Sequence, residues 1–258
     1  MDMNKGSIGL ALLMCVCIIG VFESAAQKKR IPSARTANGP RSKEVGQTAV
    51  VLDETLSVLR INPSLFSDHI QRMRRGREVK ILGTQEADGV RFYKITADKN
   101  YGWIQAEAVF GKFRTGDEER LARLVQASSG FDQLEIAAYY FTLYPASKFR
   151  PAVLLLFGDL CQEAAVRLSR DATSRLDRRE MAATGAPLHS YYLNYVGLDR
   201  YRKLGITFKF NPLTKLYYYN GGSWIELLEK FPNSTEAVEA KKRIESIRER
   251  ADAKAPTK

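Results

Sequence analysis

Histidine and cysteine are scarce in this sequence, and their scarcity narrows the chemistry that it can support. There are two histidines, His69 and His189, and three cysteines. Zinc sites are built from clusters of Cys and His, so we predict no metal site. A catalytic cysteine needs a nearby base, and neither histidine lies in a recognisable cysteine-enzyme motif. A glycine-rich phosphate loop and a nucleophile elbow are also missing. We therefore predict no cofactor and no enzymatic activity, with an enzyme of unfamiliar pattern as the alternative.

Long hydrophobic runs are also rare, and the one present lies at the N-terminus. It extends from Ile8 to Phe22, which is shorter than the roughly 20 residues of a membrane-spanning helix. Lys5 precedes it and Ser24-Ala25-Ala26 follows, which is typical of a cleaved signal peptide over residues 1–26. The protein would then be exported, periplasmic or secreted, with no stable transmembrane span after cleavage. An uncleaved anchor, or a lipoprotein modified at Cys15 or Cys17, are the alternatives.

Cys161 would be the only cysteine of the mature chain, which excludes an internal disulfide. It lies at helical spacing from Ala164, Ala165 and Leu168. This stripe of small and apolar residues predicts a buried packing position for the thiol.

Acidic residues are outnumbered, with 29 Asp and Glu against 40 Lys and Arg, so the net charge is +11. In the cytosol such a charge would suggest nucleic acid as a partner. Because we predict export, we expect no nucleic acid and instead an envelope protein, peptidoglycan or another anionic wall polymer. The alternative is that the charge serves solubility alone.

Large apolar side chains are almost missing from residues 27–45, which are rich in Lys, Arg, Ser, Ala, Gly and Pro. Such a segment buries too little surface to offset its chain entropy. We predict a flexible basic linker there and a disordered tail over residues 251–258.

Short runs of alternating apolar and polar residues occupy residues 46–111. Turn residues such as Asp88-Gly89 and Asp98-Lys99-Asn100 separate them. Alternation with period two lets one face of each run be buried. Closely spaced runs of this kind predict a small all-β domain.

The order of these runs resembles the bacterial SH3 (SH3b) domains. The residues that carry the resemblance are Leu56-Ser57-Val58-Leu59-Arg60-Ile61-Asn62-Pro63-Ser64, Gly76-Arg77-Glu78-Val79-Lys80-Ile81-Leu82, Phe92-Tyr93-Lys94-Ile95 and Gly102-Trp103-Ile104. The resemblance implies an SH3-like β-barrel over residues 46–111 that binds a ligand. We take Tyr93 and Trp103 as its candidate ligand-binding residues.

The hydrophobic period changes to 3.6 after Phe110, which predicts helices through residues 115–250. Thr115 and Glu118 form a capping-box pattern before one helix, and Ser223 and Glu226 form another. Gly185-Ala186-Pro187 is expected to end the long helix that carries Cys161.

A short motif occurs twice in this helical region, as Tyr144-Pro145-Ala146-Ser147 and Phe231-Pro232-Asn233-Ser234. Each copy joins a helix with an aromatic end to a helix rich in alanine. The motif resembles the helix pairs of tetratricopeptide (TPR) proteins of the bacterial envelope, and this resemblance implies protein binding. The copies lie much further apart than the about 34-residue period of such repeats.

Residues 185–222 interrupt the helices and hold seven of the twelve tyrosines. Residues 206–210 and 216–219 predict a β-hairpin. Its tyrosines either pack the hairpin against the helices or form a recognition surface. Tyr217, Tyr218 and Tyr219 are consecutive, and successive side chains of a strand alternate faces. Either Tyr218 or the Tyr217/Tyr219 pair therefore faces outward, and we take all three as candidate ligand-binding residues.

Two clusters of arginine remain, and solvated faces are the expectation for both. They are Arg72, Arg74, Arg75 and Arg77 before a predicted strand, and Arg167, Arg170, Arg175 and Arg178 on the Cys161 helix.

Together these patterns predict an α+β multidomain protein in which a small SH3-like β-barrel precedes a mainly α-helical TPR-like domain with an inserted β-hairpin. The favoured function is a non-catalytic exported scaffold that binds proteins of the cell envelope. The alternative is an accessory protein that binds peptidoglycan in the cell wall.

Overall fold

The computed structural model describes residues 42–97, 100–176 and 178–252. The predicted signal peptide, the linker as far as residue 41 and the tail from residue 253 lie outside the described residues. The predicted tail starts too early, because the last helix continues through Asp252. Within the described ranges, no helix combines the length and hydrophobicity needed to span a bilayer.

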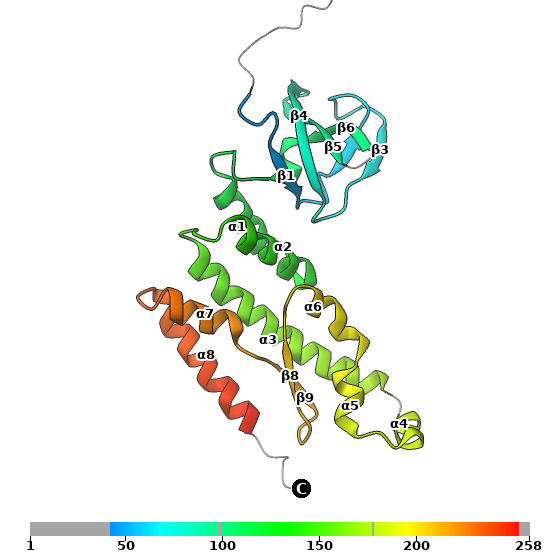
Figure 1. Ribbon diagram of the computed structural model, residues 1–258, viewed down its shortest axis with the longest axis vertical. Coiled ribbons are helices and arrows are strands. Elements are labelled where there is room, and N and C mark those ends of the chain that lie inside the picture. The colour runs from blue at the N-terminus through cyan, green and yellow to red at the C-terminus, as the bar shows by residue number, and fades with distance from the viewer. Residues whose placement is uncertain (1–41, 98–99, 177, 253–258) are drawn as a thin grey trace, which may run out of the picture. The chain divides into compact units, whose positions relative to one another are not determined.

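The first half of the described chain is one seven-stranded sheet with the strand order β3-β2-β6-β5-β4-β1-β7, and all its pairs are antiparallel (Figure 1). Its strands are β1 (Thr48–Val51), β2 (Val58–Arg60), β3 (His69–Arg72), β4 (Glu78–Ala87), β5 (Val90–Ala97), β6 (Asn100–Gln105) and β7 (Val109–Phe110). A short 3₁₀ turn, η1 (Ala106–Ala108), joins the last two.

Alternation along these strands sorts their side chains as the sequence predicts. On β4, Val79 and Ile81 are buried, whereas Glu78 and Lys80 are exposed. The buried residues of the other strands join them in one hydrophobic cluster. The predicted β-region is confirmed.

The second half is helical except for a two-stranded hairpin (Figure 1). Its elements are α1 (Asp117–Ala127), α2 (Gly130–Leu143), α3 (Arg150–Arg175), α4 (Arg178–Thr184), α5 (Leu188–Leu193), η2 (Val196–Leu198), α6 (Asp199–Lys203), β8 (Phe208–Asn211), β9 (Leu216–Tyr219), α7 (Gly222–Lys230) and α8 (Thr235–Asp252). The predicted helical region with an inserted hairpin is therefore present.

Helix α3 is the element on which the helical region packs. It contacts α2, α7, α8 and strand β9. Gly158 lies where α7 crosses, and a Cβ atom at this position would stand 2.1 Å from Nε1 of Trp224. Cys161 is fully buried one turn further along, as its apolar stripe predicts.

The repeated aromatic-Pro-small-Ser motif builds the same turn in both places. The backbone N–H of Ser147 donates to the carbonyl of Tyr144 over 3.2 Å, and that of Ser234 donates to Phe231 over 3.0 Å. The motif thus joins α2 to α3 and α7 to α8 by equivalent turns.

Neither predicted capping box forms. Helix α1 begins after Gly116, which has a left-handed φ of 87° and provides no side-chain cap. Glu118 instead accepts a hydrogen bond from the hydroxyl of Ser147, in the turn before α3. Helix α7 begins after Gly221, and Glu226 accepts two hydrogen bonds from Arg150. In both cases the glutamate carboxylate hydrogen-bonds to a residue distant in sequence instead of capping its own helix.

The first arginine cluster is not simply solvated. Arg75 has a side chain that is 9% exposed, and it pairs with Glu135 at 2.8 Å and with Asp132 at 3.3 Å. Its Nε donates to the carbonyl of Leu52. The guanidinium therefore ties the sheet to helix α2, which explains why it leaves solvent.

A buried carboxylate forms a second tie between sheet and helices. Asp117 accepts hydrogen bonds from the Gly111 backbone, Arg114 and Arg120. Arg120 also donates to the carbonyls of Glu107 and Val109, both over 2.8 Å. The predicted division between residues 111 and 115 is thus crossed by several polar contacts.

Candidate functional site

Strand β6 carries Trp103 between two buried residues. Gly102 and Ile104 are buried, whereas Trp103 is half-buried and Tyr101 is 62% exposed. A Cβ atom on Gly102 would approach the carbonyl oxygen of Arg60 to 2.7 Å. Glycine therefore allows β2 to lie close to β6, and the next residue turns its indole to the outer face.

Cross-strand pairing places a cation on each side of Trp103. Lys94 of β5 pairs with Trp103, and Arg60 of β2 pairs with it on the other side. Residues directly opposite each other in a sheet share a face and lie close enough to interact. Among the described residues, neither cation has an ion-pair partner. The outer face therefore presents an indole ring between two positive charges.

Exposed apolar side chains also occur on the strands and loop next to this row. They come from the segment after β2, from β3 and from β6, and they are Ile61, Phe66, Ile70 and Tyr101, with Phe66 88% exposed. We call these four residues together with Arg60, Lys94 and Trp103 the Trp103 face. Aromatic and apolar groups beside cations are the composition of binding hot spots.

The loop that carries Phe66 is held by an acid of the β4–β5 turn. Oδ2 of Asp88 accepts hydrogen bonds from the Ser64 hydroxyl at 2.7 Å and from the Leu65 N–H at 2.8 Å. The Ser64 hydrogen bond holds the pKa of Asp88 below its ordinary value. Asp88 has a φ of 53°, which Asp tolerates better than most residues. Asp88 thus fixes the tip of this loop.

Residues 55–109 match a family model described as a bacterial SH3 domain. We call them the SH3-like segment. They contain the whole Trp103 face, so the match falls on the residues that carry the resemblance in the sequence. Comparison with curated proteins and with solved structures found no match.

Within the SH3-like segment, Tyr93 does not reach the surface. Its side chain is fully buried, because β5 turns Tyr93 and Ile95 to the core and Lys94 outward. Burial raises the pKa of its hydroxyl. The ring of Phe113 packs edge-on against it, with 6.5 Å between ring centroids. Tyr93 is therefore a core residue, and Trp103 alone of the two predicted residues has an exposed part.

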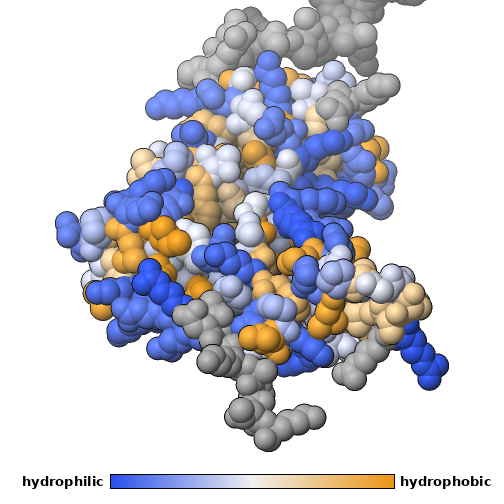
Figure 2. All heavy atoms as spheres, turned by 60° about the horizontal axis from the view of Figure 1, so that its bottom comes forward, coloured by the Kyte–Doolittle hydropathy of each residue, from blue (hydrophilic) through white to orange (hydrophobic). Residues whose placement is uncertain are grey.

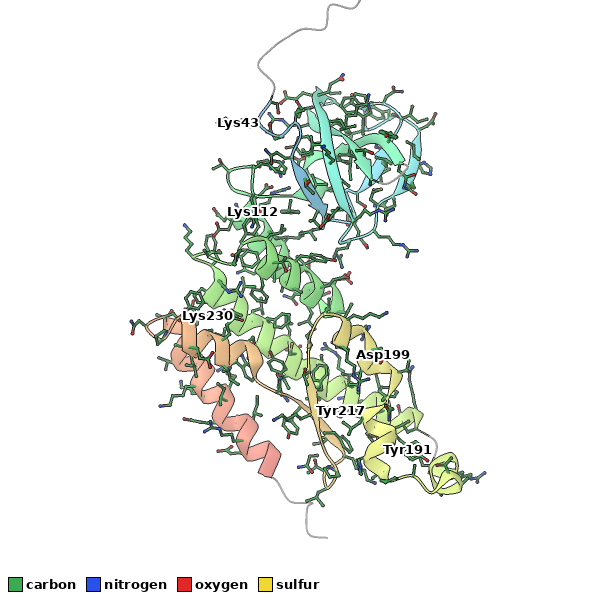
Figure 3. All side chains as sticks on the ribbon, viewed as in Figure 1. Lys43, Lys112, Tyr191, Asp199, Tyr217 and Lys230 are labelled. Carbon is green, nitrogen blue, oxygen red and sulfur yellow. The ribbon has the colours of Figure 1, made fainter. Side chains whose placement is uncertain are left out.

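The tyrosines of the hairpin divide in the same way. Tyr217 and Tyr219 are 2% and 4% exposed, and Tyr218 is half-buried. The hydroxyl of Tyr217 (Figure 3) donates to the carbonyl of Tyr192, and that of Tyr219 accepts the N–H of Ser223 at 2.8 Å. These two rings pack the hairpin onto the helices, and Tyr218 is the predicted contact residue that faces outward.

Backbone groups of β9 are also satisfied by helix α3. The N–H of Tyr217 donates to the Ser169 hydroxyl at 2.8 Å, and the N–H of Tyr219 donates to Oε1 of Gln162 at 3.1 Å. An unpaired strand edge would invite another chain. Here α3 covers that edge, so the hairpin is fixed with Tyr218 on its free face.

Three residues that the sequence does not single out belong to these surfaces. Arg60 and Lys94 flank Trp103, and Lys209 pairs with Tyr218 across the hairpin. Each lies at an outward position of its strand, which alternation indicates. The residue that lies opposite each of them depends on the register between strands, and a single sequence does not give that register.

Within the described ranges, no three His, Cys, Asp or Glu side chains gather where they could hold a metal ion. Burial raises the pKa of the Cys161 thiol, which keeps it protonated and unreactive at neutral pH. What both surfaces offer is shape, aromatic area and positive charge.

Proposed function

We propose that this protein is an exported, non-catalytic scaffold of the cell envelope that binds other proteins. The observation that carries the proposal is the Trp103 face, a half-buried indole between two cations within a segment that matches a bacterial SH3 domain. Export is supported by the N-terminal pattern of Lys5, the apolar run and Ser24-Ala25-Ala26. The net positive charge favours acidic partners.

The architecture of the proposed scaffold is an SH3-like barrel followed by TPR-like helix pairs. The pairs are α2 with α3 and α7 with α8, which pack against each other and are joined by equivalent turns. The elements α4 to β9 separate the two pairs, which accounts for the long distance between the motifs. Such an array offers protein-binding surfaces apart from the sheet.

Capture of partners from an envelope extract tests the proposal. We expect the full chain to retain envelope proteins, and Trp103→Ala to lose at least about tenfold in capture, since buried aromatic anchors dominate interface energy. Melting temperature should stay close to that of the unchanged protein, because the indole is half-buried. Equal capture by the unchanged protein and the variant, with both folded, would show that the Trp103 face takes no part in binding.

A second candidate function is attachment to peptidoglycan or another anionic wall polymer. Arg60 and Lys94 favour it, because two cations beside a ring suit a carboxylated or phosphorylated chain. Sedimentation with purified cell walls separates it from protein scaffolding. Wall binding should weaken with added salt and with Lys94→Glu. A chain that stays in solution with walls but retains envelope proteins would exclude this candidate.

A further inference from the structure

The outer face of the β8–β9 hairpin lies between two hollows. Tyr218 is the residue that both share. The larger hollow has a volume of about 570 Å³ and opens between β9, α7 and α8. The smaller, of about 240 Å³, lies between the hairpin and α3. Tyr218 thus lies at the border of both hollows.

Aliphatic side chains from two helices line the larger hollow. They are Ile225, Leu228, Ile244 and Ile247. Ile225 is 42% exposed although it belongs to the same helix as the fully buried Leu227. Val166 and Leu216 line the smaller hollow and are 48% and 53% exposed. In Figure 2, which looks onto this end of the helical region, hydrophobic residues form separate patches among hydrophilic ones.

The lysines and the arginine at the larger hollow differ from three other cations of α7 and α8. Lys209, Lys241 and Arg248 line it, and none has an ion-pair partner among the described residues. On other faces of α7 and α8, Lys230, Lys242 and Arg243 all pair with acids. Two acids, Glu229 and Glu245, complete the rim, and they too have no ion-pair partner in the part of the chain that the structure describes. An apolar floor within a charged rim is the organisation of a protein interface.

From this arrangement we infer that the hairpin binds an acidic peptide segment of a partner protein, in which two aliphatic side chains straddle Tyr218. Two hollows that share one bordering residue suit side chains repeated along a peptide better than one compact molecule. Three cations without an ion-pair partner in the described ranges, one on β8 and two on α8, outnumber the two acids of the rim and favour carboxylates beside those side chains. The inference rests on the proposed binding function but concerns a surface separate from the Trp103 face.

Selection from a displayed library of random twelve-residue peptides tests it. The full chain is the target, and the Tyr218→Ser variant removes peptides that bind elsewhere. We expect enriched peptides to be acidic and to carry two aliphatic residues within about one helical turn, or at alternate positions of a strand. No enrichment, or enrichment of basic peptides, overturns the inference.

The affinity of an enriched peptide then separates specific contacts from general charge. Tyr218→Ser should weaken binding by about tenfold or more, the scale of an aromatic anchor. Tyr218→Phe keeps the ring and should remain within about threefold, and the melting temperature of Tyr218→Ser shows whether that variant is folded. Equal affinity of the Ser variant overturns the inference.

Two neighbouring lysines supply the matched charge control. Lys241→Glu changes the rim of the hollow and should weaken binding by about fivefold, with a smaller salt dependence than the unchanged protein shows. Lys242→Glu makes the same change of charge on a side chain that pairs with Glu239 at 2.7 Å and does not line this hollow, and it should leave affinity unchanged. Equal losses of affinity in the two variants would show that net charge alone explains the effect, and would overturn the inference.

A lipid ligand is the remaining outcome. Binding to phosphatidylglycerol vesicles that depends on Tyr218, with no peptide enriched, would assign the hollows to an acyl chain and overturn the peptide assignment. Trp103→Ala should leave the peptide affinity intact. A failure of the scaffold proposal at the Trp103 face can therefore be distinguished from a failure of the peptide assignment at the hairpin.

Discussion

Removing the carboxylate of Asp117 is the sharpest test of how the sheet and the helices are held together. Asp117 is 2% exposed and accepts hydrogen bonds from Arg114 Nε at 2.6 Å, Arg120 Nη2 at 3.1 Å and the Gly111 N–H at 3.2 Å. Asp117→Ala removes the nearest counter-charge of two guanidinium groups, leaving Arg114 with Glu107 at 3.9 Å, and it leaves one backbone donor without its acceptor. The side chain itself fills little space, so the effect is mainly electrostatic.

The expected loss follows from the burial of the partners. Breaking a buried ion pair by removing one member costs about 3–5 kcal/mol. The side chains of Arg114 and Arg120 are 18% and 28% exposed, so water recovers part of that loss. Arg120 also keeps its bonds to two carbonyls and lies over the ring of Phe110 at 3.9 Å. We therefore expect a loss of about 2–4 kcal/mol in the free energy of unfolding.

Urea unfolding, followed by two probes, measures this loss. Trp103→Phe leaves Trp224 as the one tryptophan, so its fluorescence reports on the helical region, while far-ultraviolet dichroism reports on the whole chain. The two curves should coincide, because Leu52 and Phe110 of the sheet belong to the hydrophobic cluster of the helices. A fragment of residues 46–111 would expose these two side chains, and we expect it to be less stable than the full chain.

Glu119→Ala is the matched control. Glu119 lies in the same first turn of α1, and its pair with Arg123 is exposed on both sides, so we expect a change within about 0.5 kcal/mol. A loss below about 1 kcal/mol for Asp117→Ala would refute the reasoning that its buried carboxylate stabilises the junction. Separate transitions for the two probes would refute the shared core.

The remaining predictions concern single buried groups. Burial raises the pKa of Tyr219 from 10.0 to about 12. The stabilisation by the protonated Tyr219 hydroxyl is therefore complete below pH 10 and is lost as pH rises toward 12. Absorbance titration of the phenolates and unfolding curves at the same pH values will show this loss. Burial opposes ionisation of Glu226, but hydrogen bonds from Arg150 and Lys230 outweigh it and lower the pKa of Glu226 from 4.5. The stabilisation by the ionised carboxylate is therefore present above pH 4.5 and lost as pH falls further. Glu226→Gln should remove this pH-dependent part of the stability. Cys161→Ala should cost around 1 kcal/mol, the usual scale of a small core truncation, and the native thiol should react slowly with iodoacetamide at neutral pH, whereas fast alkylation would show an exposed thiolate.

Periodicity indicated the class and order of most elements in the described chain, although it did not indicate β3. Period two before Phe110 and period 3.6 after it reflect which side chains a strand or a helix turns to one face, and the structure has strands and helices accordingly. The same alternation required Tyr218 to face away from Tyr217 and Tyr219. The repeated Pro-containing motif determined two turns, because its hydrogen bonds are local.

Tertiary contacts decided which of those positions are available to a partner. Alternation allowed either face of β9 to be buried, and the choice came from α3, which accepts the backbone N–H groups of Tyr217 and Tyr219 through Ser169 and Gln162. Tyr93 likewise became core, because the sheet turns it toward Phe113. These contacts join residues far apart in the chain, so no local pattern contains them.

Electrostatic partners show the same limit. Glu118 and Glu226 stand where a capping box needs them, yet Ser147 in the turn before α3 and Arg150 at its start engage them instead. Arg75 stands in a loop that reads as solvated, yet two acids of α2 bury it. A charged group binds the strongest partner within reach, and the fold decides which groups are within reach. Sequence therefore determined the elements and their faces, and tertiary structure determined the neighbours.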